Sequence, residues 1–314
     1  MTAAGKPITT AGKPILVVGS INLDLVANTP RIPHAGETLI GDDFQTHHGG
    51  KGANQAVAAA RLGYPVRMIG RVGDDAFGAE LKSGMASEGI DTAAVGISKG
   101  SSGVAVIVVA ASGENSIVVV PGANAMLTPA DLEANLEMIR SAGIVLAQLE
   151  IPLETVVRLA EICARENVPL MLDPAPARDL PGELLSHVTW FTPNETEAAF
   201  YAKTSESTDN QATAQSLRNT GIASVALKLG ARGAYLASKN GLAQSIHPFA
   251  VHAVDTTAAG DCFNGAFAVA LMQGKSPQES ARFASAASAI SVTRAGAQPS
   301  MPTMDEVLAM LSKA

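Results

Sequence analysis

The apolar positions of this chain form short runs that alternate with segments of helical spacing. Each run is ended by polar or turn residues, as in buried strands, and several of the helical segments end at a glycine. The alternation predicts an α/β fold with a central, mostly parallel sheet flanked by helices. The predicted strands are 15–18, 66–69, 144–149, 168–172 and 225–229, and the predicted helices are 52–62, 75–88, 153–166, 195–201, 211–220, 260–272, 277–292 and 303–312.

Two stretches depart from this alternation. Val104–Val109 and Ile117–Val120 are β-branched runs joined by a short turn, which indicates a β-hairpin. Asn28–Gly52 is rich in Pro, Gly and polar residues and lacks helical periodicity, so it is either a functional loop or a small strand-built flap. No linker-like composition divides the chain. We expect a disordered leader over residues 1–13 and a single α/β domain over 14–314, with a small β-sheet lid contributed by about 22–50 and 100–121.

Composition narrows the class of protein. Hydrophobic residues make up 47% of the 314 residues and charged residues 16%, enough for a deep core. A net charge of -7 disfavours nucleic-acid binding, although a local site can still attract an anionic nucleotide. The chain has two isolated cysteines, no apolar stretch of the roughly 20 residues that span a bilayer, and no signal-peptide layout. We expect a soluble, cytoplasmic protein that binds neither nucleic acid nor membrane.

The run Asp255–Asp261 is the first candidate site. The small residues Ala258, Ala259 and Gly260 let a ligand approach the backbone, and free N–H groups at a helix start suit an anion such as a phosphoryl group. The helix macrodipole favours the ionised form of Asp261, which could then accept a hydroxyl proton at neutral pH. Taken alone, such an aspartate is more often a plain helix start.

A glycine-lined turn precedes the helix at 52–62. It is not a Walker phosphate loop, because Gly52 rather than Ser or Thr follows Lys51. Lys51 and Asn54, which follow Gly50, could hydrogen-bond a polyol. For this stretch taken alone, a tight strand-to-helix turn with no ligand is an equally good interpretation.

Polar residues also follow several predicted strands. Asn22 and Asp24 alternate and so point to one face, where an amide and a carboxylate suit neighbouring sugar hydroxyls, although an Asx turn would explain them too. Glu150 follows a strand at the edge where α/β sheets bind ligands. Asn194 lies at a strand-to-helix junction and also fits a helix N-cap.

The order of these motifs resembles that of the ribokinase-like carbohydrate kinase family from Ile15 to the end of the chain. No single motif is specific, but so many in one order make a chance resemblance very improbable. The segments that carry it are Gly49–Ala56, Gly113–Asn115, Pro121–Asn124, Gln148–Glu150, Asp173–Arg178, Thr192–Glu197, Asp255–Asp261 and Phe263–Gly265.

This resemblance implies a fold with a β lid whose copies pair into a homodimer. It implies MgATP as phosphoryl donor and D-ribose as acceptor, giving ribose 5-phosphate. Asp261 would take the proton from the ribose 5-hydroxyl, while the backbone of Ala258–Asp261 neutralises charge on the transferred group. The residues that would hold the sugar are Asn22, Asp24, Gly50, Lys51, Asn54, Glu150 and Asp261.

The same resemblance assigns nucleotide and cation sites. The ATP-binding positions would be Asn194, Lys228, Leu229, Gly230, Ala231, Arg232, Gly233, Gly260, Asp261 and Ser285. A monovalent cation, normally K⁺, would be bound at Asp255, Thr257, Ser291, Arg294, Gly296 and Ser300, where oxygen ligands suit a hard ion.

Lys228 is a departure, since the family typically has Thr there; it could reach a phosphate or lie in solvent. Kinases for deoxyribose, another sugar or a nucleoside remain alternatives, as does a non-catalytic sugar or nucleotide sensor on the same fold.

Overall fold

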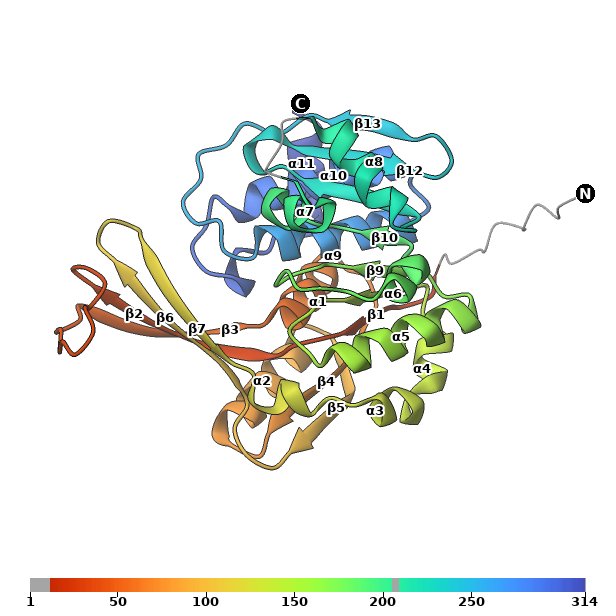
Figure 1. The fold of residues 1–314 in the computed structure, drawn as a ribbon. Helices are drawn as coiled ribbons and strands as arrows, with labels where there is room; N and C mark the ends of the chain where they lie inside the picture. The colour runs from red at the N-terminus through yellow and green to blue at the C-terminus, as the bar shows by residue number, and fades with distance from the viewer. Residues whose placement is uncertain (1–11, 205–208, 314) are drawn as a thin grey trace, which may run out of the picture.

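The computed structural model describes residues 12–204 and 209–313, and the leader expected at 1–13 lies almost wholly outside them. Across the described residues the chain forms a nine-stranded sheet in the order β13-β12-β11-β10-β9-β8-β1-β4-β5 (Figure 1). Neighbouring strands are parallel except at the β11–β12 and β12–β13 pairs. The strands are β1 (Ile15–Val18), β4 (Val66–Gly73), β5 (Asp91–Ser98), β8 (Ile144–Ala147), β9 (Leu170–Leu172), β10 (Trp190–Phe191), β11 (Ser224–Lys228), β12 (Ala234–Ser238) and β13 (Ala243–Ile246).

Helices cover both faces of this sheet, because alternate strand residues point to opposite sides. In β1, Ile15 and Val17 belong to one buried apolar cluster and Leu16 and Val18 to the other. The first face packs on α1 (Lys51–Arg61), α2 (Ala76–Ser87), α9 (Ala259–Met272), α10 (Pro277–Ser291) and α11 (Met304–Leu311). The second packs on α3 (Pro129–Ala134), α4 (Leu136–Arg140), α5 (Leu153–Glu166), α6 (Gly182–His187), α7 (Glu195–Ala202) and α8 (Asn210–Asn219).

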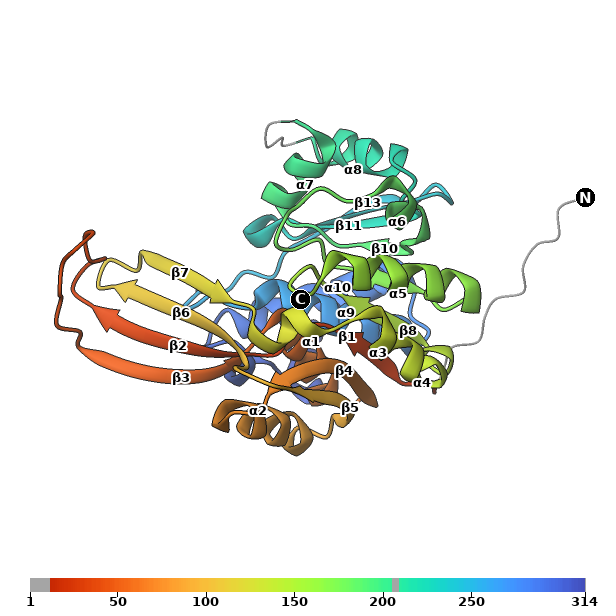
Figure 2. The ribbon, with the colours of Figure 1, turned by 60° about the horizontal axis from the view of Figure 1, so that its bottom comes forward.

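A second, four-stranded sheet projects from the body (Figures 1 and 2). Its order is β3-β2-β6-β7, built from β2 (Asn22–Thr29), β3 (Asp43–Gly49), β6 (Gly103–Ala110) and β7 (Asn115–Val120). The β6–β7 hairpin predicted from the β-branched runs is confirmed. The long polar segment before α1 is strand-built, because β3 pairs antiparallel with β2. We call this sheet the lid.

Several elements were not predicted. β5 and β13 contain exposed positions that interrupt an apolar run, and β13 lies at the sheet edge. β12 is buried and apolar over its first four residues, yet it was not predicted from the sequence. β10 has only two residues. Among the described residues, none of the helices combines the length and the apolar character needed to span a bilayer.

Candidate active site

The start of α9 presents open backbone donors. Ala258 precedes the helix with a φ of 57°, a left-handed conformation that is unusual for a residue with a side chain. The N–H of Cys262 donates to the carbonyl oxygen of Ala258 at 2.9 Å. The N–H groups of Gly260 and Asp261 come earlier in the first turn, where a helix supplies no acceptor of its own. This geometry suits an anion at the helix start.

The side chain of Asp261, in the first turn of α9, is fixed by hydrogen bonds from two side-chain amides of α1. Its side-chain Oδ2 accepts a hydrogen bond from Nδ2 of Asn54 and its Oδ1 one from Nε2 of Gln55, both at 3.1 Å. Asp261 is only 5% exposed. Burial, opposed by the charge of Lys51 and assisted by that of Asp173, raises its pKa to about 6. The carboxylate is therefore more basic than an ordinary aspartate, and its ionised form still prevails at neutral pH.

Further carboxylates surround Lys51 at the start of α1. Glu150 Oε2 accepts hydrogen bonds from Ser20 Oγ at 2.6 Å and from the Lys51 backbone N–H at 3.2 Å. Burial, together with the charges of Glu150 and Asp261, raises the pKa of Asp24 to about 7. Burial alone would lower the pKa of Lys51, but the carboxylates around it raise the pKa above its ordinary value. Lys51 therefore remains a cation in this acidic setting.

Asn22 and Gly50 meet where the lid joins the body. Oδ1 of Asn22 accepts a hydrogen bond from Nδ2 of Asn124 at 2.7 Å, and Oδ1 of Asn124 accepts one from the backbone N–H of Ile21. Gly50 has a φ of +87°, and a Cβ there would lie 2.7 Å from the backbone nitrogen of Asn22. The turn therefore requires glycine, and it brings the predicted sugar-binding segments together.

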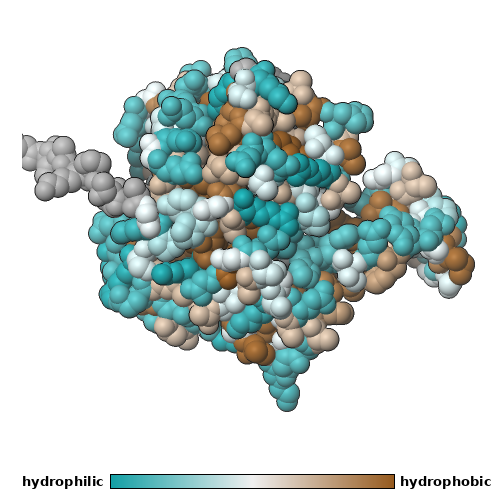
Figure 3. Space-filling model, turned by 180° about the vertical axis from the view of Figure 1, so that it is seen from behind, coloured by the Kyte–Doolittle hydropathy of each residue, from teal (hydrophilic) through white to brown (hydrophobic). Residues whose placement is uncertain are grey.

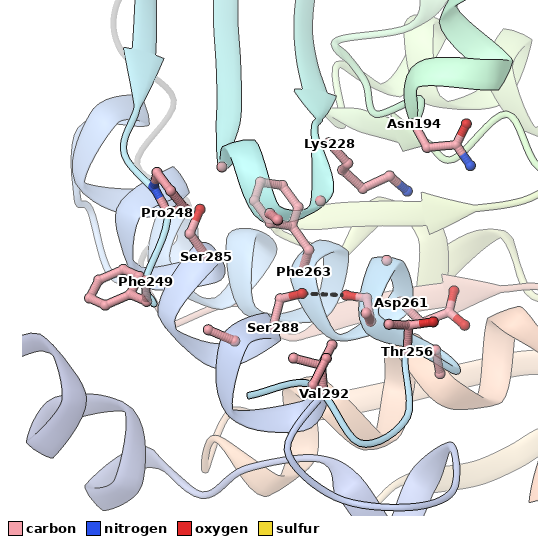
Figure 4. Close-up of a pocket in the computed structure, with 18 of the residues that line it drawn as sticks. Asn194, Lys228, Pro248, Phe249, Thr256, Asp261, Phe263, Ser285, Ser288 and Val292 are labelled. Atoms are coloured by element: carbon pink, nitrogen blue, oxygen red, sulfur yellow. Dashed lines mark hydrogen bonds between the residues drawn. The ribbon is translucent and has the colours of Figure 1, made fainter. Parts of the chain in front are cut away.

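A cavity of about 650 Å³ opens beside Asp261 (Figure 4). Lys228, Asn194 and Asp261 lie on one side of it, and Pro248 and Phe249 lie on the other (Figure 4). An apolar slot leading to a polar, anion-binding end suits a flat base that carries phosphates. The predicted nucleotide positions that line it are Asn194, Lys228, Gly230, Ala231, Gly233, Gly260, Asp261 and Ser285.

Two predicted nucleotide positions do not line the cavity. Leu229 is buried in the core beneath the turn, and Arg232 pairs with Glu195 at the surface. The N-cap interpretation of Asn194 is correct as well, since its side chain accepts the backbone N–H of Glu197 at 2.8 Å. Asn194 thus caps α7 and faces the cavity.

Sequence reasoning assigned no role to Gln55, Gln148, Asp173 and Glu197. Asp173 and Glu197 line the cavity, and Asp173 accepts a hydrogen bond from Gln55 at 3.0 Å. Gln148 fixes the orientation of the Gln55 amide by donating to its Oε1 at 2.8 Å. Gln148 and Asp173 are buried polar residues just after β8 and β9, and that position at the carboxyl end of a parallel strand was the available signal.

Two of the predicted cation-binding residues, Thr257 and Gly296, contact Asp255. Its Oδ1 accepts from the backbone N–H of Thr257 and its Oδ2 from that of Gly296, both at 2.8 Å. Burial opposes ionisation, but these hydrogen bonds bring the pKa of Asp255 below its ordinary value. Arg294, by contrast, pairs with Glu306. The side chains of Ser291 and Ser300 donate to nearby backbone carbonyls, those of Ser288 and Ala297.

The sequence model of the family described as "pfkB family carbohydrate kinase" matches residues 13–304 of the chain. The chain belongs to the pfkB carbohydrate kinase family. This membership confirms the resemblance drawn from the ordered motifs, and it makes the chain a kinase.

Two curated ribokinases and one solved ribokinase structure match this pfkB kinase over nearly their whole lengths. It is 45% identical to a ribokinase of Haemophilus influenzae, covering 95% of this chain and 98% of the relative. It is 46% identical to a ribokinase of Bacillus subtilis, covering 94% and 98%. The structure of Arabidopsis thaliana ribokinase complexed with ribose and ATP superimposes with a TM-score of 0.87 at 38% identity, covering 95% and 98%. The predicted α/β fold with a β lid is thereby confirmed.

Proposed function

We propose that this kinase transfers the γ-phosphoryl group of ATP to the 5-hydroxyl of D-ribose. The observation that carries the proposal is the place of Asp261. Its carboxylate contacts Asn54 in the first turn of α1 and also lines the cavity, beside open N–H groups. The names of the two bacterial relatives and the ribose and ATP in the Arabidopsis structure support the same sugar and the same donor.

The proposed sugar site has unused hydrogen-bonding capacity. Within the described residues, no donor pairs with Oδ1 of the buried Asn54. A buried acceptor left unpaired is costly, and a sugar hydroxyl would satisfy it. Asn22 and Asp24 follow one another on the same face of β2, where they suit neighbouring hydroxyls, and Lys51 and Glu150 close the group.

The proposed catalytic step is a proton transfer to Asp261 as the sugar oxygen attacks the phosphorus. The pKa of about 6 keeps the carboxylate ionised at neutral pH, yet basic enough to accept the proton. The backbone N–H groups of Gly260 and Asp261 face the position where charge develops on the transferred group. Ala258 and Ala259 keep the approach to this backbone free of bulky side chains.

Two metal ions belong to the proposal. Mg²⁺ would accompany ATP and neutralise phosphate charge, and the carboxylate of Glu197 at the cavity provides the oxygen chemistry that this ion prefers. K⁺ would be bound by the loops that meet at Asp255, an ionised carboxylate with neighbouring backbone carbonyls. The hydrogen bonds of Asp255 connect these loops to the residues just before α9, so the chain's own contribution is to fix the shape of the helix start.

The assembly we propose is a homodimer formed through the lid, in the cytoplasm. β7 is an edge strand of the lid and is exposed along its whole length. Figure 3 shows hydrophobic patches on the projecting lid. Its exposed large apolar residues are Phe44, Val106, Ile117, Val118, Val119 and Val120. An apolar edge of this kind is typical of a surface that is covered by a partner.

The test is an ADP-release assay with D-ribose, 2-deoxy-D-ribose, D-fructose and nucleosides, each with and without K⁺. We expect the highest kcat/KM with ribose, a phosphate on O5 of the product by NMR, and slower turnover without K⁺. A preference for deoxyribose or a nucleoside would replace the proposed acceptor. Absence of ADP release with every acceptor would contradict kinase activity on these substrates and favour a sensor.

A further inference from the structure

Lys228 ends β11 at the point where the cavity meets the start of α9. Its side chain is only 12% exposed, and its Nζ lies 2.9 Å from Oδ1 of Asp173, which is itself 3% exposed. The other oxygen of Asp173 accepts the hydrogen bond from Gln55. Asp173 is thus fixed on both sides, and the ammonium group is held in place rather than lying in solvent.

The lysine side chain runs alongside Gly260. A Cβ built on Gly260 would lie 3.2 Å from Nζ of Lys228, so the absent side chain leaves room for the ammonium beside the open N–H groups of α9. Figure 4 shows Lys228 extending from the end of its strand over this helix start. An ammonium has three N–H donors, and Asp173 takes one of them within the described residues.

Carboxylates outnumber ammonium groups around the cavity, so an anionic ligand needs a cationic contact near the start of α9. The lining of the cavity includes three carboxylates, those of Asp173, Glu197 and Asp261, against the ammonium groups of Lys51 and Lys228. Lys51 is already surrounded by carboxylates on the sugar side. A nucleotide polyphosphate that enters this acidic cavity therefore meets its fixed positive charge at Lys228.

We propose that Lys228 is a catalytic residue that binds the phosphoryl group being transferred, with Asp173 as the positioning residue that aims it. The proposal rests on the proposed function, since it assumes a nucleotide triphosphate as donor. In this arrangement Lys228 adds a charged contact to the backbone donors of the helix start.

The test compares Lys228→Met with Lys239→Met, a control lysine that is exposed beyond β12 and does not line the cavity. Calorimetry measures the affinity of each protein for AMP and for a non-hydrolysable ATP analogue. We expect Lys228→Met to weaken analogue binding by about 10- to 100-fold, the size of a charge-assisted hydrogen bond, and to lower kcat. AMP affinity should not change, and the control should match the wild type. Unchanged analogue affinity, or an equal loss for AMP, would overturn the proposal.

A double variant separates phosphate binding from simple neutralisation of Asp173. Lys228→Met alone leaves a buried carboxylate unpaired, whereas Lys228→Met with Asp173→Asn removes both charges. Analogue binding should remain weak in the double variant, and recovery to the wild-type level would show that Lys228 serves only to neutralise Asp173. Failure of the proposed function would be visible separately, as an absence of ADP release by the wild type, while the binding measurements still test Lys228.

Discussion

Two groups of neighbours shift the pKa of the Asp261 carboxylate in opposite directions. Lys51 and the amides of Asn54 and Gln55 stabilise its charge, whereas burial, the largest effect, and the nearby Asp173 disfavour it. The second group prevails, and the pKa rises from 3.8 to about 6. A carboxylate at that value is ionised at neutral pH and is a far stronger base than an exposed aspartate.

The activity should therefore depend on pH in a range where ordinary aspartates do not titrate. Below a pH of about 6 Asp261 becomes protonated and cannot accept the hydroxyl proton, so kcat/KM should fall about tenfold per pH unit. The measurement is a pH–rate profile from pH 4.5 to 8 at saturating MgATP. Asp24→Asn should keep this acidic limb, because Asp24 binds sugar in our proposal. A profile that stays flat down to pH 4.5 would exclude a base with a raised pKa.

The functional roles of some residues could be predicted from sequence, and those of others could not. Asp261 and Lys51 stand beside glycines in turns that were ambiguous alone, and the order of the motifs along the chain made their roles predictable. Asp173 carries no such pattern, because its role depends on Lys228, which lies 55 residues further along the chain. A pair of this kind exists only once the fold has brought two strand ends together.

At the scale of elements, strands buried on both faces were predicted well, because both of their faces are apolar. β1 and β8 are fully buried and read as continuous apolar runs. β5 and β13 were missed because exposed residues interrupt them. β7 belongs to neither group, since its residues are apolar although they are all exposed.

The exposed edge of β7 leads to a prediction about assembly. Val118 is 61% exposed, and a charge there would be desolvated if two lids pack together. Val118→Asp should therefore shift the protein from dimer to monomer in sedimentation equilibrium, leaving the body folded by circular dichroism. Leu308→Asp, at a 50% exposed position on α11, is the matched control and should remain a dimer. A wild-type monomer, or a dimeric Val118→Asp variant, would contradict pairing through the lid.

The site becomes complete only at the scale of the whole molecule. The alternation of strands and helices predicted that the ligand-binding groups lie at the carboxyl ends of the strands, and this part of the site follows from sequence. The distance between sugar-holding and nucleotide-holding groups does not follow from it. In the structure α1 and α9 pack together and place Asn54 and Asp261 in contact across 207 residues of chain. The result is one carboxylate shared by two binding regions.

The most direct test of the proposed role of Asp261 is to measure ligand affinities and kcat for the Asp261→Asn variant. The unpaired Oδ1 of Asn54 lets that amide turn and accept a hydrogen bond from the new side chain, so the fold should tolerate the change. We expect ribose and ATP-analogue affinities to stay within a few-fold of the wild type, while kcat falls by roughly 10²- to 10⁴-fold, as for loss of a general base. Turnover close to that of the wild type, with binding intact, would contradict the role of Asp261 as the base.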